Sequence, residues 1–258
     1  MDDARPATEA STRYDGEGTD ALRARLGVPA LHAYAYAPST MDLAHAAAAT
    51  GAPAGTVIVA DVQTAGRGRN GRRWVSHAGA GVWATVIERP RDVDALSVLS
   101  LRVGIALALE LERIVGRALA LKWPNDVLLD GRKLAGVLAE ARWREGMPEW
   151  VAIGVGVNRD PPAEMRDATG TDAAVRRTTL LGAIVRAIRA AADRDGVLDG
   201  TELSQFAVRD AVRGREVVSP VEGRAAGVNA RGELLVRTAT GVERAVPTAT
   251  VQYRPLAP

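Results

Sequence analysis

The chain has 258 residues, and its 33 Lys and Arg against 31 Asp and Glu leave a formal net charge of only +2. Hydrophobic residues at 47% and charged residues at 25% are typical of a globular protein, and the near balance of charge argues against general nucleic-acid binding. The absence of cysteine excludes disulfides, thiolate metal sites and a cysteine nucleophile. Because the start "MDDARPATEAST" is acidic and polar, and no run of about 18 apolar residues occurs, we expect a cytoplasmic protein without signal peptide or membrane span.

The first half of the chain predicts helices and strands in alternation. Residues 1–20 are polar, and we expect them to form a flexible tail. The patterns that follow predict a helix over 19–27, a strand over 31–38, a helix over 39–51 and a buried strand over 55–63. After a stretch rich in glycine and arginine come a predicted strand over 81–89 and a long amphipathic helix over 95–117.

The second half begins with strands joined by tight turns. Residues 117–143 predict a strand broken at Pro124, a second strand, a turn at Asp130–Gly131 and a third strand. A strand over 149–159 and a helix over 178–194 follow, and short strands from about Gly214 onward indicate a small all-β barrel. This order favours an α+β fold, with a mixed, largely antiparallel sheet and helices on one face, over a doubly wound parallel sheet. The expected division is a tail at 1–20, a main domain at 21–212 and the barrel at 213–258.

The stretch "GRGRNGRRW" (66–74) concentrates positive charge on flexible backbone. It admits three interpretations: a solvated basic turn, an arginine-rich RNA-binding segment, or a loop that binds an anion through backbone N–H groups and arginines. It is not a Walker loop, because GxxxxGK[ST] is absent, and no helical pattern follows it as a Rossmann fingerprint requires.

Further motifs favour the anion-binding interpretation. "KWPND" (122–126), "GRKLAG" (131–136) and "GVGVN" (154–158) follow the basic loop, and Ser39, Thr40 and Gln63 precede it. In this order and spacing the chain resembles the biotin protein ligases over roughly residues 20–258. The resemblance implies a catalytic domain with the class II synthetase-like fold shared with lipoate ligases, acting on biotin and ATP with Mg²⁺. Such an enzyme makes biotinyl-5′-AMP and transfers biotin to a lysine of a biotin carboxyl carrier protein domain.

The resemblance also implies roles for particular residues. It places biotin against Ser39, Thr40, Met41, Gln63, Arg67, Gly68, Arg69, Lys133 and Gly136. It places ATP against Arg69, Arg72, Trp74, Asn125, Lys133 and Asn158. The catalytic set is Lys133, Arg69 and Asp126, with Lys133 reaching the biotin carboxyl and the α-phosphate, and with Asp126 orienting or deprotonating the acceptor lysine. Residues 159–178 are expected to surround adenine.

Several of these residues have a simpler interpretation that stays open. Ser39 and Thr40 precede a helix and satisfy the spacing of a capping box, so they are also candidate N-cap residues. Arg72 and Arg73 are either phosphate contacts or exposed surface, and Trp74 is also a candidate packing anchor of the loop. The three histidines show no ligand spacing, so Mg²⁺ is expected to be held mainly by ATP rather than by a protein cage.

Two positions depart from the family pattern, and some relatives have an additional domain. Met41 stands where a polar side chain is usual, and Asn70 where many relatives carry a basic residue. The winged helix-turn-helix of some relatives does not fit before Leu31, so we expect no DNA binding, and we expect a monomer or weak homodimer. The rival functions are a lipoate–protein ligase and, more distantly, a nucleic-acid-binding module that uses the arginine loop.

Overall fold

The structure is a computed structural model that describes residues 8–90, 92–247 and 251–254. Its main feature is an eight-stranded sheet in the order β1-β4-β5-β6-β10-β9-β8-β7. In that order the strands are Glu9–Ser11, Leu31–Ala37, Thr56–Gln63, Gly81–Glu88, Met147–Asn158, Arg132–Arg144, Asp126–Leu129 and Ala120–Lys122. The β4–β5 pair is parallel and the remaining pairs are antiparallel, which confirms the mixed, largely antiparallel sheet.

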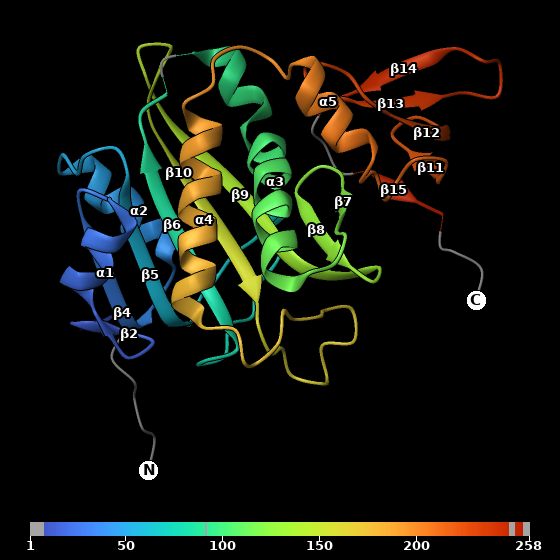
Figure 1. The fold of residues 1–258 in the computed structure, drawn as a ribbon. Coiled ribbons are helices and arrows are strands. Elements are labelled where there is room, and N and C mark those ends of the chain that lie inside the picture. The colour runs from blue at the N-terminus through green and yellow to red at the C-terminus, as the bar shows by residue number, and fades with distance from the viewer. Residues whose placement is uncertain (1–7, 91, 248–250, 255–258) are drawn as a thin grey trace.

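Helices cover both faces of this sheet rather than one. Figure 1 shows α3 (Val93–Val115) and α4 (Arg177–Ala192) side by side across one face. Helix α2 (Thr40–Ala49) packs on the opposite face. In strand β5, Ile58 belongs to the hydrophobic cluster that contains residues of α2, whereas its neighbours Val57 and Val59 belong to the larger cluster under α3 and α4. Successive side chains of a strand point to opposite faces, so a strand buried on both faces reads as a continuous apolar run. The prediction of helices on one face was therefore wrong.

The segment before α1 (Thr19–Leu26) is not a flexible tail where the structure describes it. Besides β1, it forms the short pair β2 (Arg13–Tyr14) and β3 (Glu17–Gly18). Tyr14 is 3% exposed, and the Arg177 guanidinium stacks on its ring at 4.8 Å. Asp15 accepts hydrogen bonds from the backbone N–H and Nε of Arg177. One buried aromatic ring and one carboxylate with an arginine partner outweigh the polar composition that suggested disorder.

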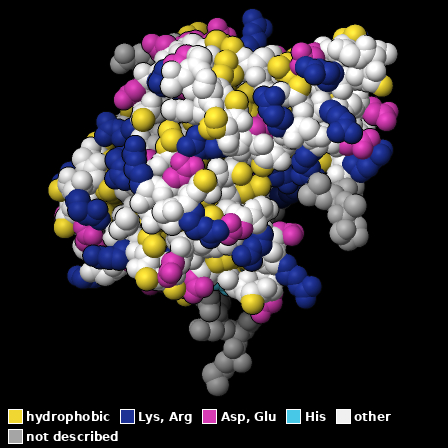
Figure 2. All heavy atoms as spheres, turned by 45° about the vertical axis from the view of Figure 1, so that its right-hand side comes forward, with side chains coloured by type: hydrophobic (Ala, Val, Ile, Leu, Met, Phe, Trp, Pro, Cys, Tyr) yellow, Lys and Arg dark blue, Asp and Glu magenta, His cyan; other side chains and the backbone are white. Residues whose placement is uncertain are grey.

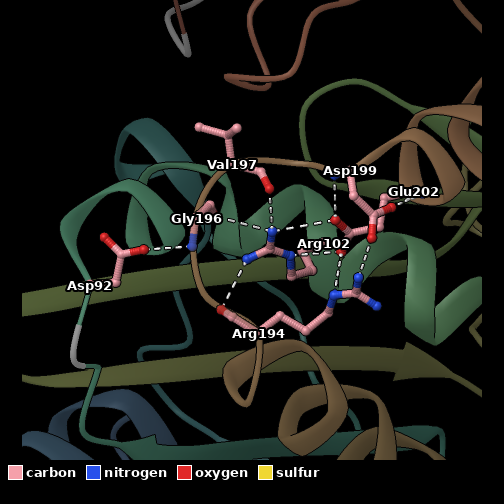
Figure 3. A network of polar contacts seen from close by, with 7 residues as sticks. All are labelled: Asp92, Arg102, Arg194, Gly196, Val197, Asp199 and Glu202. Atoms are coloured by element: carbon pink, nitrogen blue, oxygen red, sulfur yellow. Dashed lines mark hydrogen bonds and ion pairs between the residues drawn. The ribbon is translucent and has the colours of Figure 1, made fainter.

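A buried ion pair ties α3 to α5 (Gly200–Ala207), a helix that the sequence patterns did not predict. Arg102 and Glu202 are 2% and 6% exposed at their side chains, and Arg102 Nε lies 2.7 Å from Glu202 Oε1. Arg102 also donates to the carbonyls of Arg194, Gly196 and Val197 (Figure 3). Asp199 and Glu202 form a capping box at the start of α5. These contacts hold the connection between α4 and α5 against the side of α3.

The C-terminal strands form a separate five-stranded antiparallel sheet in the order β14-β13-β12-β11-β15. In that order the strands are Glu243–Val246, Leu234–Arg237, Gly223–Val228, Glu216–Ser219 and Gln252–Tyr253. No ladder between β14 and β15 occurs in the part of the chain that the structure describes, so the expected all-β unit appears as an open sheet rather than as a closed barrel. Trp123 Nε1 donates to the Gly232 carbonyl at 2.9 Å and thereby ties this sheet to the strand region before Pro124. The domain boundary at 212/213 stays a prediction.

No helix within the described ranges is long and apolar enough to cross a membrane. On the face that Figure 2 shows, Lys and Arg side chains are interspersed with Asp and Glu and do not gather into one continuous basic patch. That distribution gives no support to a broad nucleic-acid surface on this face.

Candidate active site

A cavity of ≈ 340 Å³ lies on the face of the large sheet that carries α2. Its floor is made of strand positions without side chains: Gly154 and Gly156 of β10, with Gly136 of β9 directly paired to Gly156. A Cβ on Gly156 would come within 2.4 Å of the Trp74 ring, and a Cβ on Gly136 within 3.0 Å of both Trp74 and Lys133. The missing side chains thus make room above the sheet, and in this structure the Trp74 indole occupies part of that room.

The glycine- and arginine-rich stretch forms a small closed loop beside this floor. Gly68 N–H donates to the Arg72 carbonyl at 2.7 Å, and Trp74 N–H donates to the Gly66 carbonyl at 2.8 Å. The tip is a short 3₁₀ turn, Arg69–Gly71, in which Asn70 has the left-handed φ of 57°. Asparagine tolerates this conformation better than arginine or lysine does. The departure from the family pattern at Asn70 therefore matches the backbone that the loop adopts.

One end of the cavity presents hydroxyl and amide groups. Gln63 Oε1 accepts hydrogen bonds from the Thr40 backbone N–H at 2.9 Å and from Thr40 Oγ1 at 3.1 Å. Thr85 Oγ1, from β6, donates to Thr40 Oγ1 at 2.8 Å. Ser39 is the N-cap of α2 and accepts from the Met41 N–H at 3.2 Å, so its capping interpretation is met in this structure. These groups form a short, preorganised polar network suited to the donors and acceptors of a small uncharged ring.

The other end of the cavity is cationic. Lys133 Nζ lies 2.7 Å from Asp126 Oδ1 and 4.9 Å from the centre of the Trp74 ring. The Arg69 side chain has no hydrogen bond or ion pair to any residue that the structure describes. Burial lowers the pKa of its guanidinium, and the nearby Asp126 carboxylate acts in the opposite direction. A half-buried guanidinium without a partner, beside a lysine, is a site prepared for an anion.

Hydrogen bonds hold the backbone of Lys133 on both sides. Its N–H donates to the Asp167 carbonyl at 2.8 Å, and its carbonyl accepts from Thr169 N–H at 2.9 Å and from Asn158 Nδ2 at 3.0 Å. Asn158 is 4% exposed and does not line the cavity, so the structure does not bring its side chain to the position expected for ATP contact. Asn125 does line the cavity, although its Nδ2 donates to the Val137 carbonyl at 2.7 Å.

Apart from Asn158, every single residue predicted for the site lines this one cavity. The segment 159–178, which was expected to surround adenine, contributes no residue to the lining. The lining also includes residues to which the sequence analysis assigned no role: Trp83, Ala84, Thr85, Lys122, Val137, Leu138, Val155, Val251 and Tyr253. Most of these lie on strands β6, β9 and β10. A predicted strand tells which of its side chains share a face, but it does not tell how far they lie from a motif elsewhere in the chain. Val251 and Tyr253 come from the C-terminal segment, and no sequence signal connects them to the loop.

The charge of the lining is strongly biased. The basic residues are Arg67, Arg69, Arg72, Arg73, Lys122 and Lys133. Asp126 is the only acidic residue in the lining that the described residues form. No group of three or more His, Asp or Glu that could hold a metal ion occurs within the described ranges. The cavity therefore combines an uncharged polar end, a glycine floor and a cationic end, which suits a ligand that joins a neutral ring to a phosphate.

Comparisons with known proteins place the chain in a family. Residues 34–158 match the model of the "Biotin/lipoate A/B protein ligase family". The chain is also 33% identical over 223 residues to the "Bifunctional ligase/repressor BirA" of Bacillus subtilis, an alignment that spans 80% of this chain and 69% of that protein. The chain belongs to the biotin/lipoate protein ligase family.

Two further family members show the same likeness. The "Biotin--[acetyl-CoA-carboxylase] ligase" of Mycobacterium tuberculosis is 42% identical over 132 residues, which span 49% of this chain and 48% of that protein. The crystal structure of a Leishmania major biotin protein ligase in complex with biotinyl-5-AMP superposes with a TM-score of 0.60 at 26% identity and covers 84% of this chain and 98% of that one. The matched family segment contains the loop at 66–74, Lys133 and the glycine floor.

Proposed function

We propose that this protein is an ATP-dependent biotin ligase that forms biotinyl-5′-AMP and transfers biotin to a lysine of a biotin carboxyl carrier domain. The observation that carries the proposal is the two-ended cavity: Thr40, Gln63 and Thr85 at one end, and Arg69 and Lys133 at the other. The family relationship and the Leishmania major relative with biotinyl-5-AMP support it. The carrier as acceptor is suggested by the name of the Mycobacterium tuberculosis relative.

In the first step a biotin carboxylate oxygen attacks the α-phosphorus of ATP. A new O–P bond forms, the bond from that phosphorus to the bridging oxygen breaks, and pyrophosphate leaves. Two anions must approach each other, so the cost is mainly electrostatic. Lys133 and Arg69 supply positive charge at that end of the cavity, where partial burial strengthens their effect on the developing oxygen charge.

In the second step the neutral amine of the acceptor lysine attacks the acyl carbon. A C–N bond forms, the C–O bond to the phosphate breaks, AMP leaves, and the nitrogen loses a proton. Among the described residues that line the cavity, Asp126 is the one acidic residue, and its side chain is 20% exposed. It is therefore our candidate to orient the amine and accept the proton, once the ligand takes over its contact with Lys133.

The residues of the cavity fit a magnesium ion that arrives with ATP. Asp126 is the one carboxylate in the lining within the described ranges, so those residues offer a single acidic ligand, and the triphosphate would supply most of the others. The ion would neutralise phosphate charge, and its main ligands would be those of the nucleotide rather than of the chain.

The deciding experiment incubates the chain with biotin, Mg-ATP and a biotin carboxyl carrier domain, followed by avidin blotting. We expect a labelled carrier that needs ATP and the acceptor lysine, with no label on a carrier whose acceptor lysine is replaced. A parallel reaction with lipoate and a lipoyl domain, read with an anti-lipoate antibody, tests the other branch of the family. Modification of the lipoyl domain without labelling of the biotin carrier would contradict the proposal and make the chain a lipoate ligase.

A further inference from the structure

Arg67 lies in the basic loop, and each of its three guanidinium nitrogens bonds to an acidic side chain. Its Nε and Nη2 donate to the two carboxylate oxygens of Glu140 at 3.2 and 3.1 Å, and its Nη1 pairs with Asp42. Arg69, two residues further along the chain, has no such partner in the described structure. The two arginines therefore differ in their surroundings, although the resemblance places both of them against biotin.

Glu140 is itself held in place by a further partner, His45. His45 Nε2 lies 3.3 Å from Glu140 Oε2, and Trp150 Nε1 lies 2.9 Å from His45 Nδ1. Because an indole N–H only donates, His45 Nδ1 must accept, so the neutral ring carries its proton on Nε2 and donates it to Glu140. Trp150 is 7% exposed on β10, which gives the chain of contacts a fixed origin.

These contacts join three parts of the site. Glu140 belongs to β9, the strand that also carries Lys133 and Gly136. Asp42 and His45 belong to α2, whose first turn presents Thr40 to the cavity. A bidentate arginine–carboxylate pair has a strongly preferred geometry, so it fixes orientation as well as distance. Arg67 thereby fixes the loop to the helix and to the strand that form the two sides of the cavity.

We infer that Arg67 is a positioning residue that acts through Glu140, and that the Arg67–Glu140 pair is the latch that holds the basic loop over the bound adenylate. This assignment rests on the proposed function, and it replaces the direct contact with biotin that the family motif suggested for the Arg67 side chain. The direct anion contacts then fall to Arg69 and Lys133. Loss of the latch weakens ligand retention while the groups at the reacting atoms stay in place.

The test is a double-mutant cycle with Arg67→Ala, Glu140→Ala and the double variant. Each single variant should raise the KM for biotin about tenfold. This is the lower end of the effect expected from loss of a charge-assisted hydrogen bond, because both side chains are about one-third exposed. The kcat for pyrophosphate release should stay within about twofold of the wild-type value. The double variant should be no worse than either single one, because both remove the same interaction.

Arg144→Ala is the matched control. Arg144 of β9 pairs with Glu149 of β10 at 3.3 Å. Its side chain is 73% exposed, and it lies at the end of β9 that is away from Lys133. This variant should leave the KM and kcat unchanged. If the effects of the two single variants add in the double variant, Arg67 acts independently of Glu140 and the latch is wrong.

Hydrogen exchange separates the latch from the proposed function. The amides of Gly68 and Trp74 close the loop through bonds to Arg72 and Gly66, so their exchange in the ligand-free chain should be faster in both single variants, with unchanged melting temperature. Unchanged exchange in both variants would overturn the latch even if the wild-type chain biotinylates a carrier. Conversely, a wild-type chain without ligase activity would refute the proposed function, whereas faster loop exchange in the variants would still support the latch.

Discussion

The ammonium group of Lys133 lies 2.7 Å from a carboxylate oxygen of Asp126, and both side chains line the same cavity. Asp126 begins β8 and Lys133 lies near the start of β9, so the Asp130–Gly131 turn brings two motifs into contact. In the ligand-free chain this pair neutralises one charge of an otherwise basic cavity. A phosphate or carboxylate that binds there competes with Asp126 for Lys133, which releases the aspartate for the second step.

The first prediction concerns Lys133 in adenylate formation. Lys133→Ala should lower the rate of pyrophosphate release from biotin and ATP by about 10²–10³-fold, the effect of losing one donor to a developing oxyanion. Arg132→Ala is the control, because Arg132 is the exposed neighbour with only a long contact to Thr169, and it should keep the wild-type rate. A wild-type rate for Lys133→Ala would remove Lys133 from the first step.

The second prediction concerns Arg69 in retention of the adenylate. Because its guanidinium has no protein partner in the described structure, Arg69 is available to the ligand, and Arg69→Gly should still form adenylate but release it. The free mixed anhydride acylates lysines at random, so albumin added to the reaction should become biotinylated above the wild-type level. Pyrophosphate release and avidin blotting of albumin, measured together, check this. Adenylate formation without extra label on albumin would contradict the role.

The third prediction concerns the loop at 66–73 on ligand binding. The loop is closed by backbone bonds and held at its base by Ser76, whose Oγ accepts from Gln63 N–H at 2.7 Å. Exposed backbone bonds in a glycine-rich segment open easily, so biotin or its adenylate should slow hydrogen exchange across the loop. The C-terminal strands β12 and β13 serve as an internal reference. Equal protection of the loop in free and bound chain would argue against a closing loop.

The fourth prediction concerns the buried ion pair between Arg102 and Glu202. Arg102→Ala removes the short ion pair of the buried Glu202 carboxylate and leaves it the longer contact with Arg194 at 3.5 Å. The variant should therefore lower the free energy of unfolding by about 3 kcal/mol, the lower end of the cost of breaking a buried pair. Arg113→Ala removes the surface ion pair with Glu110 and should change the free energy of unfolding by less than about 1 kcal/mol. Urea unfolding of both variants gives the comparison. Equal stabilities would show that the Arg102 network does not anchor the α4–α5 connection.

The fifth prediction concerns Glu88 and pH. Burial raises the pKa of Glu88 to about 7, with Arg189 opposing the shift. The folded state therefore binds a proton that the unfolded state has lost, and stability falls as the pH rises from the usual pKa of about 4.3 towards 7. Glu88→Gln stays uncharged, so relative to wild type it should gain stability at pH 8 compared with pH 4. Glu222→Gln, at an exposed glutamate, is the control for the unfolding measurements. An identical difference at both pH values would contradict the shift.

Much of the fold could be predicted from the patterns along the chain. The expected strands around Thr56–Gln63 and Gly81–Glu88 and the long helix that became Val93–Val115 are present within a few residues. The exceptions share a cause. The β-structure before α1 depends on Tyr14 and Asp15 meeting Arg177, and α5 depends on Glu202 meeting Arg102. Short elements have weak local signals, and partners far apart in sequence stabilise them.

The sequence by itself determined the chemistry of the site, because the residue types and spacings of "GRGRNGRRW", "KWPND" and "GRKLAG" are local properties of the chain. Only the tertiary structure decided which of those residues is available to a ligand. The resemblance places both Arg67 and Arg69 against biotin, yet Glu140 and Asp42 occupy one guanidinium and leave the other without an ion-pair partner among the described residues. Likewise Thr85 and Tyr253 join the cavity, whereas Asn158 turns to the backbone of Lys133. The physical reason is that an ion pair or hydrogen bond depends on the distance between two groups in space, and spacing along the chain does not specify that distance for residues on different strands.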